Sequence, residues 1–290
     1  MNRRTLLQTA LLGATAFALR PALALASRAE ALHDRLAALE RKHGGRLGVS
    51  ILDTGTGQRL ANRGDEPFLM CSTFKLFAVA AVLARVDRGA EQLDRRVVFG
   101  KDVLLSYAPV TRQHVGAPGL SIAELCAAAI TVSDNSAANL LLESLGGPSA
   151  ITRMARGLGD SHTRLDRIEP DLNVASPGDL RDTTTPDAAV ATLQKLLLGD
   201  ALSEASRTQL VGWLRACTTG TTKLRAGLPP GWTSGDKTGS GFQNETNDIG
   251  ILFPPRREPL LVTAYYADSK ADAATRDAVL AGVGRIAAAL

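Results

Sequence analysis

Two apolar stretches near the end of the 290-residue chain decide its fold: Ile249-Gly250-Ile251-Leu252-Phe253 and Leu260-Leu261-Val262-Thr263-Ala264-Tyr265-Tyr266. Both are rich in β-branched and aromatic residues, and the proline-containing turn 254–259 separates them, a pattern that predicts two strands. Near the N-terminus, residues 47–53 and 58–62 are β-type runs on either side of the turn 54–57. Strands near both ends of the chain predict one sheet to which both ends contribute.

Helix start and stop signals divide the rest of the chain: a capping box at Ser121-x-x-Glu124, a glycine-proline stop at 146–148 after residues 135–145, and a cap-and-proline start at Thr185-Pro186. Further helices are expected at residues 27–43 and 272–288. We therefore predict an α/β fold, in which helices flank an antiparallel sheet formed by both chain ends. Residues 27–62 and 217–290 form this α/β lobe, residues 63–216 form an all-helical second lobe, and the active site lies in the cleft between them.

The first 26 residues have the features of an export signal. Arg3-Arg4 precedes an apolar run from Leu6 to Leu19, and Ala24-Leu25-Ala26 is a small-x-small cleavage pattern. The paired arginines indicate the twin-arginine route. We expect a periplasmic or secreted protein, with no membrane anchor after residues 1–26 are removed. A single anchoring helix is the alternative, but the run is short for spanning a bilayer of ~30 Å.

The net charge excludes two classes of partner. Removing the three arginines of the leader from the 33 basic residues leaves 30, against 29 acidic residues, so the mature chain carries a net charge of +1. A field of that size attracts neither nucleic acid nor a membrane surface. We expect a monomer that acts on small molecules.

Cysteine and histidine residues do not indicate a metal site. Three cysteines and four histidines are scattered along the chain at spacings that match no zinc motif: Cys71, Cys126, Cys217, His33, His43, His114 and His162. Two cysteines of an exported protein could pair, but without an evident partner we expect all three to be free. The sequence predicts neither a metal nor another cofactor.

Ser72-Thr73-Phe74-Lys75 opens a long apolar helical stretch. Positions i and i+3 share a helix face, so Lys75 can reach the hydroxyl of Ser72. A neutral serine needs such a base to become a nucleophile, and backbone N–H groups at a helix start stabilise a developing oxyanion. Taken alone, this motif is far more often that of a capping serine beside a surface lysine.

Two further triplets follow, Ser133-Asp134-Asn135 and Lys237-Thr238-Gly239. The first could simply cap the helix that follows it. The second could be a lysine at a sheet edge, but a strand with Lys, Thr and Gly can also bind an anionic group, since glycine lets a ligand approach the backbone. The three triplets occur in this order, with helices between them and strands after the last.

With these motifs the chain resembles class A serine β-lactamases of the penicillin-binding-protein-like superfamily, over residues 31–286. Further matching stretches are Arg167-x-Glu169-x-x-Leu172-Asn173, 181–186 and 236–241. The resemblance implies hydrolysis of penicillins and cephalosporins through a serine acyl-enzyme, which confers antibiotic resistance.

The resemblance implies a role for each residue of the site. Ser72 is the nucleophile, its N–H and that of Ser240 form the oxyanion hole, and Lys75 and Ser133 move protons. Glu169 positions the hydrolytic water. Substrate is bound by Asn135, Asn173, Lys237, Thr238, Ser240 and, at the rim, Tyr107. Whether Lys75 or Glu169 removes the first proton stays open.

The loop that carries Glu169 separates a hydrolase from related enzymes that stay acylated. Releasing a serine ester needs a water and a general base within hydrogen-bond reach. Related D,D-peptidases or esterases, and covalent β-lactam sensors with a membrane segment, are the alternatives. The resemblance also implies a clamp between Arg167 and Asp182, and a cis bond between Glu169 and Pro170.

The chain departs from better-known members at two positions. Thr246 stands where some members use an arginine to hold the substrate carboxylate, and we expect Lys223 to replace it in part. Gly241 stands where carbapenem-hydrolysing members have a cysteine paired with that at Cys71. That disulfide cannot form here, so we expect weak carbapenem hydrolysis.

Overall fold

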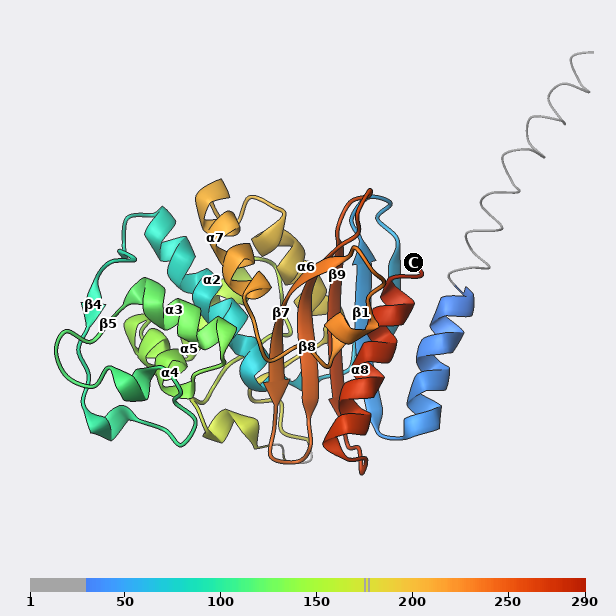
Figure 1. Cartoon of the computed structure of the whole chain (residues 1–290), viewed down its shortest axis with the longest axis horizontal. Helices are drawn as coiled ribbons and strands as arrows, with labels where there is room; N and C mark the ends of the chain where they lie inside the picture. The colour runs from blue at the N-terminus through green and yellow to red at the C-terminus, as the bar shows by residue number, and fades with distance from the viewer. Residues whose placement is uncertain (1–29, 175, 177) are drawn as a thin grey trace, which may run out of the picture.

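The computed structural model describes residues 30–174, 176 and 178–290, so the predicted export signal lies outside the described residues. Both ends of the chain build one five-stranded antiparallel sheet, as predicted (Figure 1). Its strands, in spatial order, are β2 (Arg59–Asn62), β1 (Arg46–Asp53), β9 (Leu260–Ala267), β8 (Thr246–Phe253) and β7 (Thr233–Ser240). Strand β1 pairs with β9 along its whole length, with Arg46 opposite Ala267 and Asp53 opposite Leu260.

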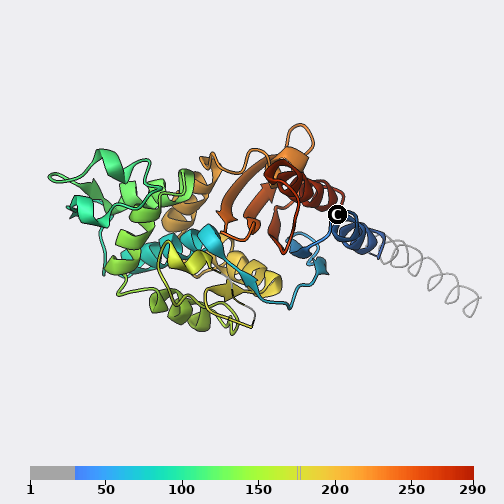
Figure 2. The same ribbon diagram turned by 90° about the horizontal axis from the view of Figure 1, so that it is seen from below.

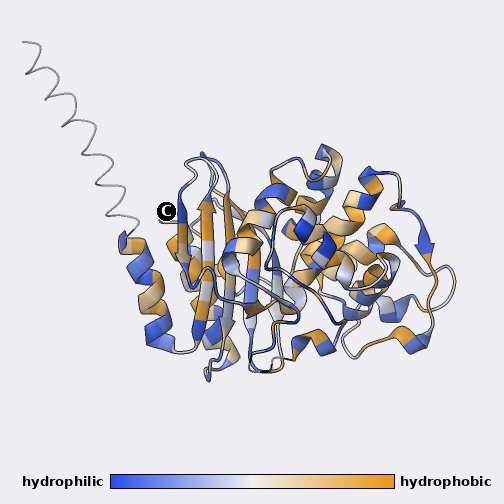
Figure 3. Ribbon diagram, turned by 180° about the vertical axis from the view of Figure 1, so that it is seen from behind, coloured by the Kyte–Doolittle hydropathy of each residue, from blue (hydrophilic) through white to orange (hydrophobic). Residues whose placement is uncertain are grey.

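Helices cover both faces of the sheet. On one face, the helix at 30–43 and α8 (Ala273–Ala287) enclose a core of alternate residues from β1 and β9, including Leu47, Val49 and Val262 (Figure 2). On the other face, α6 (Pro186–Leu197) contacts β1 and β9, and α7 (Glu204–Arg215) contacts β7. Because both faces are buried, apolar residues recur along the strands (Figure 3).

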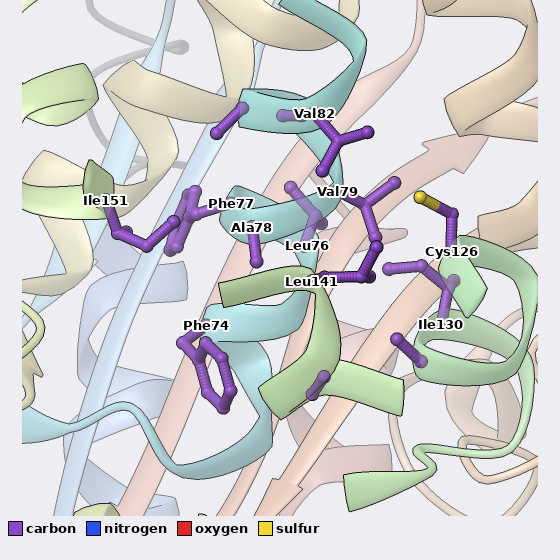
Figure 4. Close-up of a cluster of buried hydrophobic side chains, with 14 of the residues drawn as sticks. Phe74, Leu76, Phe77, Ala78, Val79, Val82, Cys126, Ile130, Leu141 and Ile151 are labelled. Carbon is purple, nitrogen blue, oxygen red and sulfur yellow. The ribbon is translucent and has the colours of Figure 1, made fainter. Parts of the chain in front are cut away.

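The helical part of the molecule is built around α2 (Phe74–Asp87). Every residue of α2 from Phe74 to Leu83 is buried, the pattern of a helix enclosed on all sides. It contacts α3 (Ile122–Thr131), α4 (Asn135–Ser144), α5 (Ser149–Gly157) and α7. Phe74, Phe77 and Val79 pack there in one buried cluster with Leu141 and Ile151, so the helix that follows Ser72 is enclosed by its neighbours (Figure 4).

The predicted capping residues begin the helices that the sequence places after them. Ser121 and Glu124 form a reciprocal capping box at α3, and Thr185 caps α6 with Pro186 in its first turn. The shorter elements are β3 (Phe68–Leu69), β4 (Arg96–Val97), β5 (Leu120–Ser121), β6 (Thr183–Thr184), η1 (Cys71–Thr73), η2 (Lys101–Val103), η3 (Thr111–Gln113), η4 (Asp171–Asn173) and η5 (Leu224–Gly227).

One helix begins later than the sequence suggests. Ser72 lies in the 3-10 turn η1, and α2 begins at Phe74. Cys71 adopts a φ of 46°, a left-handed conformation that turns the chain sharply into η1. Within the described part of the chain, no helix combines the length and apolar character needed to cross a membrane.

Candidate active site

A cleft of about 470 Å³ lies between the C-terminal half of β7 and the helical part of the molecule. The residues that line it come from η1, the loop after η2, the start of α4, η4 with the residues before it, the segment between α7 and η5, and β7 with the loop after it: Ser72, Ser106, Tyr107, Ser133, Asn135, Glu169, Pro170, Asn173, Thr219, Lys223, Thr238, Gly239, Ser240, Gly241 and Phe242. Every predicted site residue is among them except Lys75 and Lys237, which are fully buried beside the cleft.

Ser72 and Glu169 are in direct contact. The hydroxyl of Ser72 donates to Oε1 of Glu169 at 3.2 Å. The other oxygen, Oε2, accepts from the amide of Asn173 at 2.5 Å. The Glu169 side chain is inaccessible to solvent, so one oxygen faces the nucleophile while the other is held by the amide.

Lys75 links these groups to the start of α4. Its Nζ lies 3.1 Å from Oε1 of Glu169 and donates to Oδ1 of Asn135 at 2.6 Å and to the backbone carbonyl of Ser133 at 2.9 Å. Ser72 and Lys75 therefore meet at one carboxylate oxygen. Burial lowers the pKa of Lys75, and the negative charge of Glu169 offsets only part of this effect.

Ser133 lies between two ammonium groups. Its Oγ accepts from Nζ of Lys237 at 3.0 Å and from Nζ of Lys75 at 3.3 Å. Because both lysines donate, the hydrogen of the hydroxyl is free to point to a third group. Burial lowers the pKa of Lys237 to about 8, and repulsion from Lys75 contributes. Ser133 is held in place at a positive φ of 61°.

The packing of β7 against η1 requires a glycine at position 239, whether or not a ligand is bound. A Cβ at this position would lie 2.8 Å from the backbone oxygen of Met70 and 3.2 Å from the Cβ of Cys71. The absence of a side chain therefore lets β7 approach η1 closely enough to place Ser240 in the same cleft as Ser72. The sequence analysis had assigned this glycine to the approach of a ligand only.

The loop that carries Glu169 is anchored at both ends. Asp182, fully buried, accepts from Nε of Arg167 at 2.5 Å and from the backbone N–H groups of Asp166 at 2.7 Å and Arg167 at 2.9 Å. The predicted clamp is thus present, as is the predicted cis bond between Glu169 and Pro170.

Asn139 is a positioning residue that the sequence analysis missed. Its amide donates to the backbone carbonyl of Glu169 at 2.9 Å, and its Oδ1 accepts from the N–H of Glu169 at 3.0 Å. Asn139 lies four residues after Asn135 on α4, so both project from one helix face. That spacing could have indicated a second functional asparagine.

Two residues of α8, Arg276 and Asp277, contact side chains at or near the cleft and were not predicted from the sequence. Nε of Arg276 donates to Oγ1 of Thr246 at 3.1 Å, so Thr246 has a cationic partner that the sequence did not indicate. Lys223 lines the cleft as expected, but its Nζ already forms an ion pair with Oδ1 of Asp277 at 2.8 Å.

The three cysteines are free and buried, as expected. A Cβ on Gly241 would lie 3.0 Å from Sγ of Cys71, so the two positions are indeed neighbours. Burial raises the pKa of the Cys71 thiol well above its usual value, which keeps it protonated beside the nucleophile. Within residues 30–174, 176 and 178–290, no group of three or more His, Cys, Asp or Glu residues is placed to hold a metal ion.

Known proteins share this architecture over most of the chain. A model of the β-lactamase enzyme family matches residues 31–290. The chain is 45% identical over 263 residues to β-lactamase OXY-2 of Klebsiella oxytoca, covering 91% of this chain and 90% of that protein. It is 46% identical to β-lactamase CTX-M-8 of Citrobacter amalonaticus, covering 90% of each. An ancestral class A β-lactamase of known structure is 62% identical, with a TM-score of 0.86 over 88% of this chain and 98% of that one.

These similarities cover the whole cleft, and the relatives are named as β-lactamases rather than as peptidases or sensors. The chain therefore belongs to the class A β-lactamases and is a serine enzyme that hydrolyses the β-lactam ring, the reaction that confers resistance to these antibiotics.

Proposed function

We propose that Ser72 opens the ring of penicillins and cephalosporins and that Glu169 directs water to the resulting ester. The observation that carries this proposal is the 3.2 Å contact between Oγ of Ser72 and Oε1 of Glu169. A carboxylate so close to the nucleophile can act as general base for a water that attacks the carbonyl carbon of the ester on Ser72. Asn173, held by the other oxygen, supplies the second contact for that water.

Acylation uses a proton path through Lys75, Ser133 and Glu169. Oγ of Ser72 attacks the ring carbonyl and gives its proton to the unit formed by Glu169 and Lys75, which meet at 3.1 Å. The ring C–N bond breaks, and the ring nitrogen takes a proton from Ser133, which regains one from Lys75 across the 3.3 Å contact between Nζ and Oγ. The lowered pKa of Lys75 supports this path, because it brings the neutral amine closer to working pH. The N–H groups of Ser72 and Ser240 stabilise the oxyanion.

The substrate carboxylate binds where β7 ends. Lys237 supplies the charge, and the hydroxyls of Thr238 and Ser240 add bonds that are stronger to a charged acceptor. Lys223 and Arg276 add positive charge beyond them. At the opposite end, Asn135 holds the side-chain amide of the substrate. Tyr107, half exposed at the rim, packs against its side chain.

Turnover of a chromogenic cephalosporin by the purified protein tests the proposal. We expect continuous hydrolysis with many turnovers per enzyme. A single burst of one equivalent would contradict it. The same assay with imipenem should show slow release of the hydrolysed product, because Gly241 leaves Cys71 without a cross-link. Fast imipenem turnover would show that carbapenem hydrolysis does not depend on that disulfide.

The binding role of Lys223 has its own test. Lys223→Ala should raise KM for penicillins and cephalosporins while changing kcat less, the pattern of lost uniform binding. Clavulanate, which presents the same carboxylate, should inactivate this variant more weakly. An unchanged KM would remove Lys223 from the site.

We further propose that the protein acts as a monomer outside the cytoplasm, either in the periplasm or secreted from the cell, after residues 1–26 are removed. Residues 27–62 with 217–290 and residues 63–216 would then form its two lobes. The twin-arginine pattern of the leader and the small charge of the mature chain support this assignment.

A further inference from the structure

The carboxylate of Asp277 forms an ion pair with Lys223, a residue that lines the cleft. Its Oδ1 lies 2.8 Å from Nζ of Lys223, and its Oδ2 accepts from Oγ1 of Thr222 at 2.5 Å. Both oxygens are thus engaged by the segment that enters η5. Lys223 itself is 9% exposed and lines the cleft beside Thr219 and Thr238.

This ion pair is poorly screened by water. The side chains of Lys223 and Asp277 are 11% and 23% exposed, so their interaction is stronger than that of a surface pair. Lys223 also faces the buried Asp248. Burial and repulsion from Asp236 raise the pKa of Asp248 well above its usual value, which favours its neutral form. Asp277 is therefore the carboxylate that balances the charge of Lys223.

We propose that Asp277 sets the affinity for substrate by competing with the carboxylate of the β-lactam for Lys223. A lysine ammonium is a compact point charge that two carboxylates can share, but each weakens its attraction for the other. This proposal rests on the binding role of Lys223 proposed above. Asp277 contacts no reacting atom, so it is a specificity-determining residue and not a catalytic one.

The competition changes binding rather than chemistry. The substrate carboxylate contacts the same groups before and during ring opening. A change in the strength of these contacts therefore shifts KM and leaves kcat nearly unchanged. It also concerns only substrates that carry the negative charge. The methyl ester of benzylpenicillin lacks that charge and should be insensitive to Asp277.

Steady-state kinetics of Asp277→Asn and Asp277→Ala test the proposal, with benzylpenicillin and its methyl ester as substrates. Asparagine keeps the size of the side chain and can still accept from Thr222. We expect KM for benzylpenicillin to fall about three- to fivefold, as for the loss of a partly exposed ion pair. The kinetic constants for the ester should not change. Asp272→Asn, which removes the same charge from the N-terminal cap of α8, is the matched control and should leave KM unchanged.

The Lys223→Ala background separates the two proposals. Asp277→Asn should have no effect there, because the ammonium for which the two carboxylates compete is gone. A raised or unchanged KM in Asp277→Asn, with Lys223→Ala itself raising KM, would overturn the competition while leaving the role of Lys223 intact. An unchanged KM in Lys223→Ala would instead overturn the role of Lys223 and the competition with it.

Discussion

Positive charge is concentrated around one hydroxyl, that of Ser133. Two buried ammonium groups donate to it. Burial lowers the pKa of both lysines, and repulsion from Lys75 lowers that of Lys237 further. Because Lys237 has a pKa of about 8, its charge is present below this pH and is lost as the pH rises above it. The cation that binds the substrate carboxylate is thus titrated close to physiological pH.

This titration predicts a basic limb in the pH profile of kcat/KM. For benzylpenicillin, kcat/KM should fall as the pH rises through about 8, since a neutral Lys237 cannot attract the carboxylate. Lys237→Arg should move that limb to higher pH, because arginine keeps its charge throughout the range. A basic limb at the same pH in both proteins would assign it to another group.

The sequence predicts which residues meet in the cleft where short spacing places them together. Ser72 and Lys75 lie one turn apart, and Glu169 and Asn173 share one loop. Arg276 and Asp277 could not be predicted in this way. They are at least 30 residues from Thr246 and Lys223, whose side chains they contact, and only the packing of α8 decides which of its residues reach these groups.

At the scale of elements, the loop between Arg167 and Asp182 holds Glu169, the proposed general base, in place. Asp182 satisfies three donors while adopting a positive φ of 60°, a conformation that the surrounding contacts must stabilise. Asn139 fixes the backbone of Glu169 from α4. Glu169 is therefore held from two sides, by its own loop and by α4, which precedes that loop in the sequence and lies beside it in the structure.

Asp182→Asn should loosen this loop. Removing one partner of a buried ion pair costs about 3–5 kcal/mol, and asparagine retains part of the hydrogen bonding, so we expect a loss near ~2 kcal/mol. Thermal unfolding should show a Tm lower by about 5 °C, with slower turnover of penicillin. Asp179→Asn is the control, because Asp179 pairs with Arg181 at the exposed surface of the same loop and its loss should leave Tm unchanged. Equal effects of the two substitutions would refute the clamp.

Local signals in the sequence predict the bounds of several elements to within one or two residues. Residues 135–145 and 272–288 were expected to be helical and form α4 (Asn135–Ser144) and α8 (Ala273–Ala287). The start of α2 was misplaced because the chain first makes the turn η1, in which Thr73 donates to the carbonyl of Met70 at 2.7 Å. Strand order was also beyond local reasoning, since β1 pairs with a strand more than 200 residues away.

At the scale of the whole molecule, the nucleophile lies where the buried helix α2 meets the sheet. The turn η1 contacts both β7 and β8, and the first strand of the chain closes the same sheet. The site therefore exists only when both ends of the chain are folded together. We expect export of the enzyme to require a route that carries folded proteins, or folding after transport.

The twin-arginine leader predicts export by the route that carries folded proteins. Replacing Arg3 and Arg4 by lysine should retain active enzyme inside the cell and remove it from the periplasm. N-terminal sequencing of the exported protein should begin at Ser27. Export of the lysine variant at the parent rate would contradict this route and indicate the general secretory pathway.

The most direct test of the account is intact mass spectrometry of Glu169→Ala mixed with benzylpenicillin. Loss of a general base typically slows its step by ~10²–10⁴-fold, whereas Lys75 remains to assist acylation. We predict that the variant accumulates a stable adduct of one penicillin, mapped to Ser72, while the parent protein shows only free enzyme and hydrolysed product. A Glu169→Ala protein that turns over benzylpenicillin at the parent rate without an adduct would contradict the central claim.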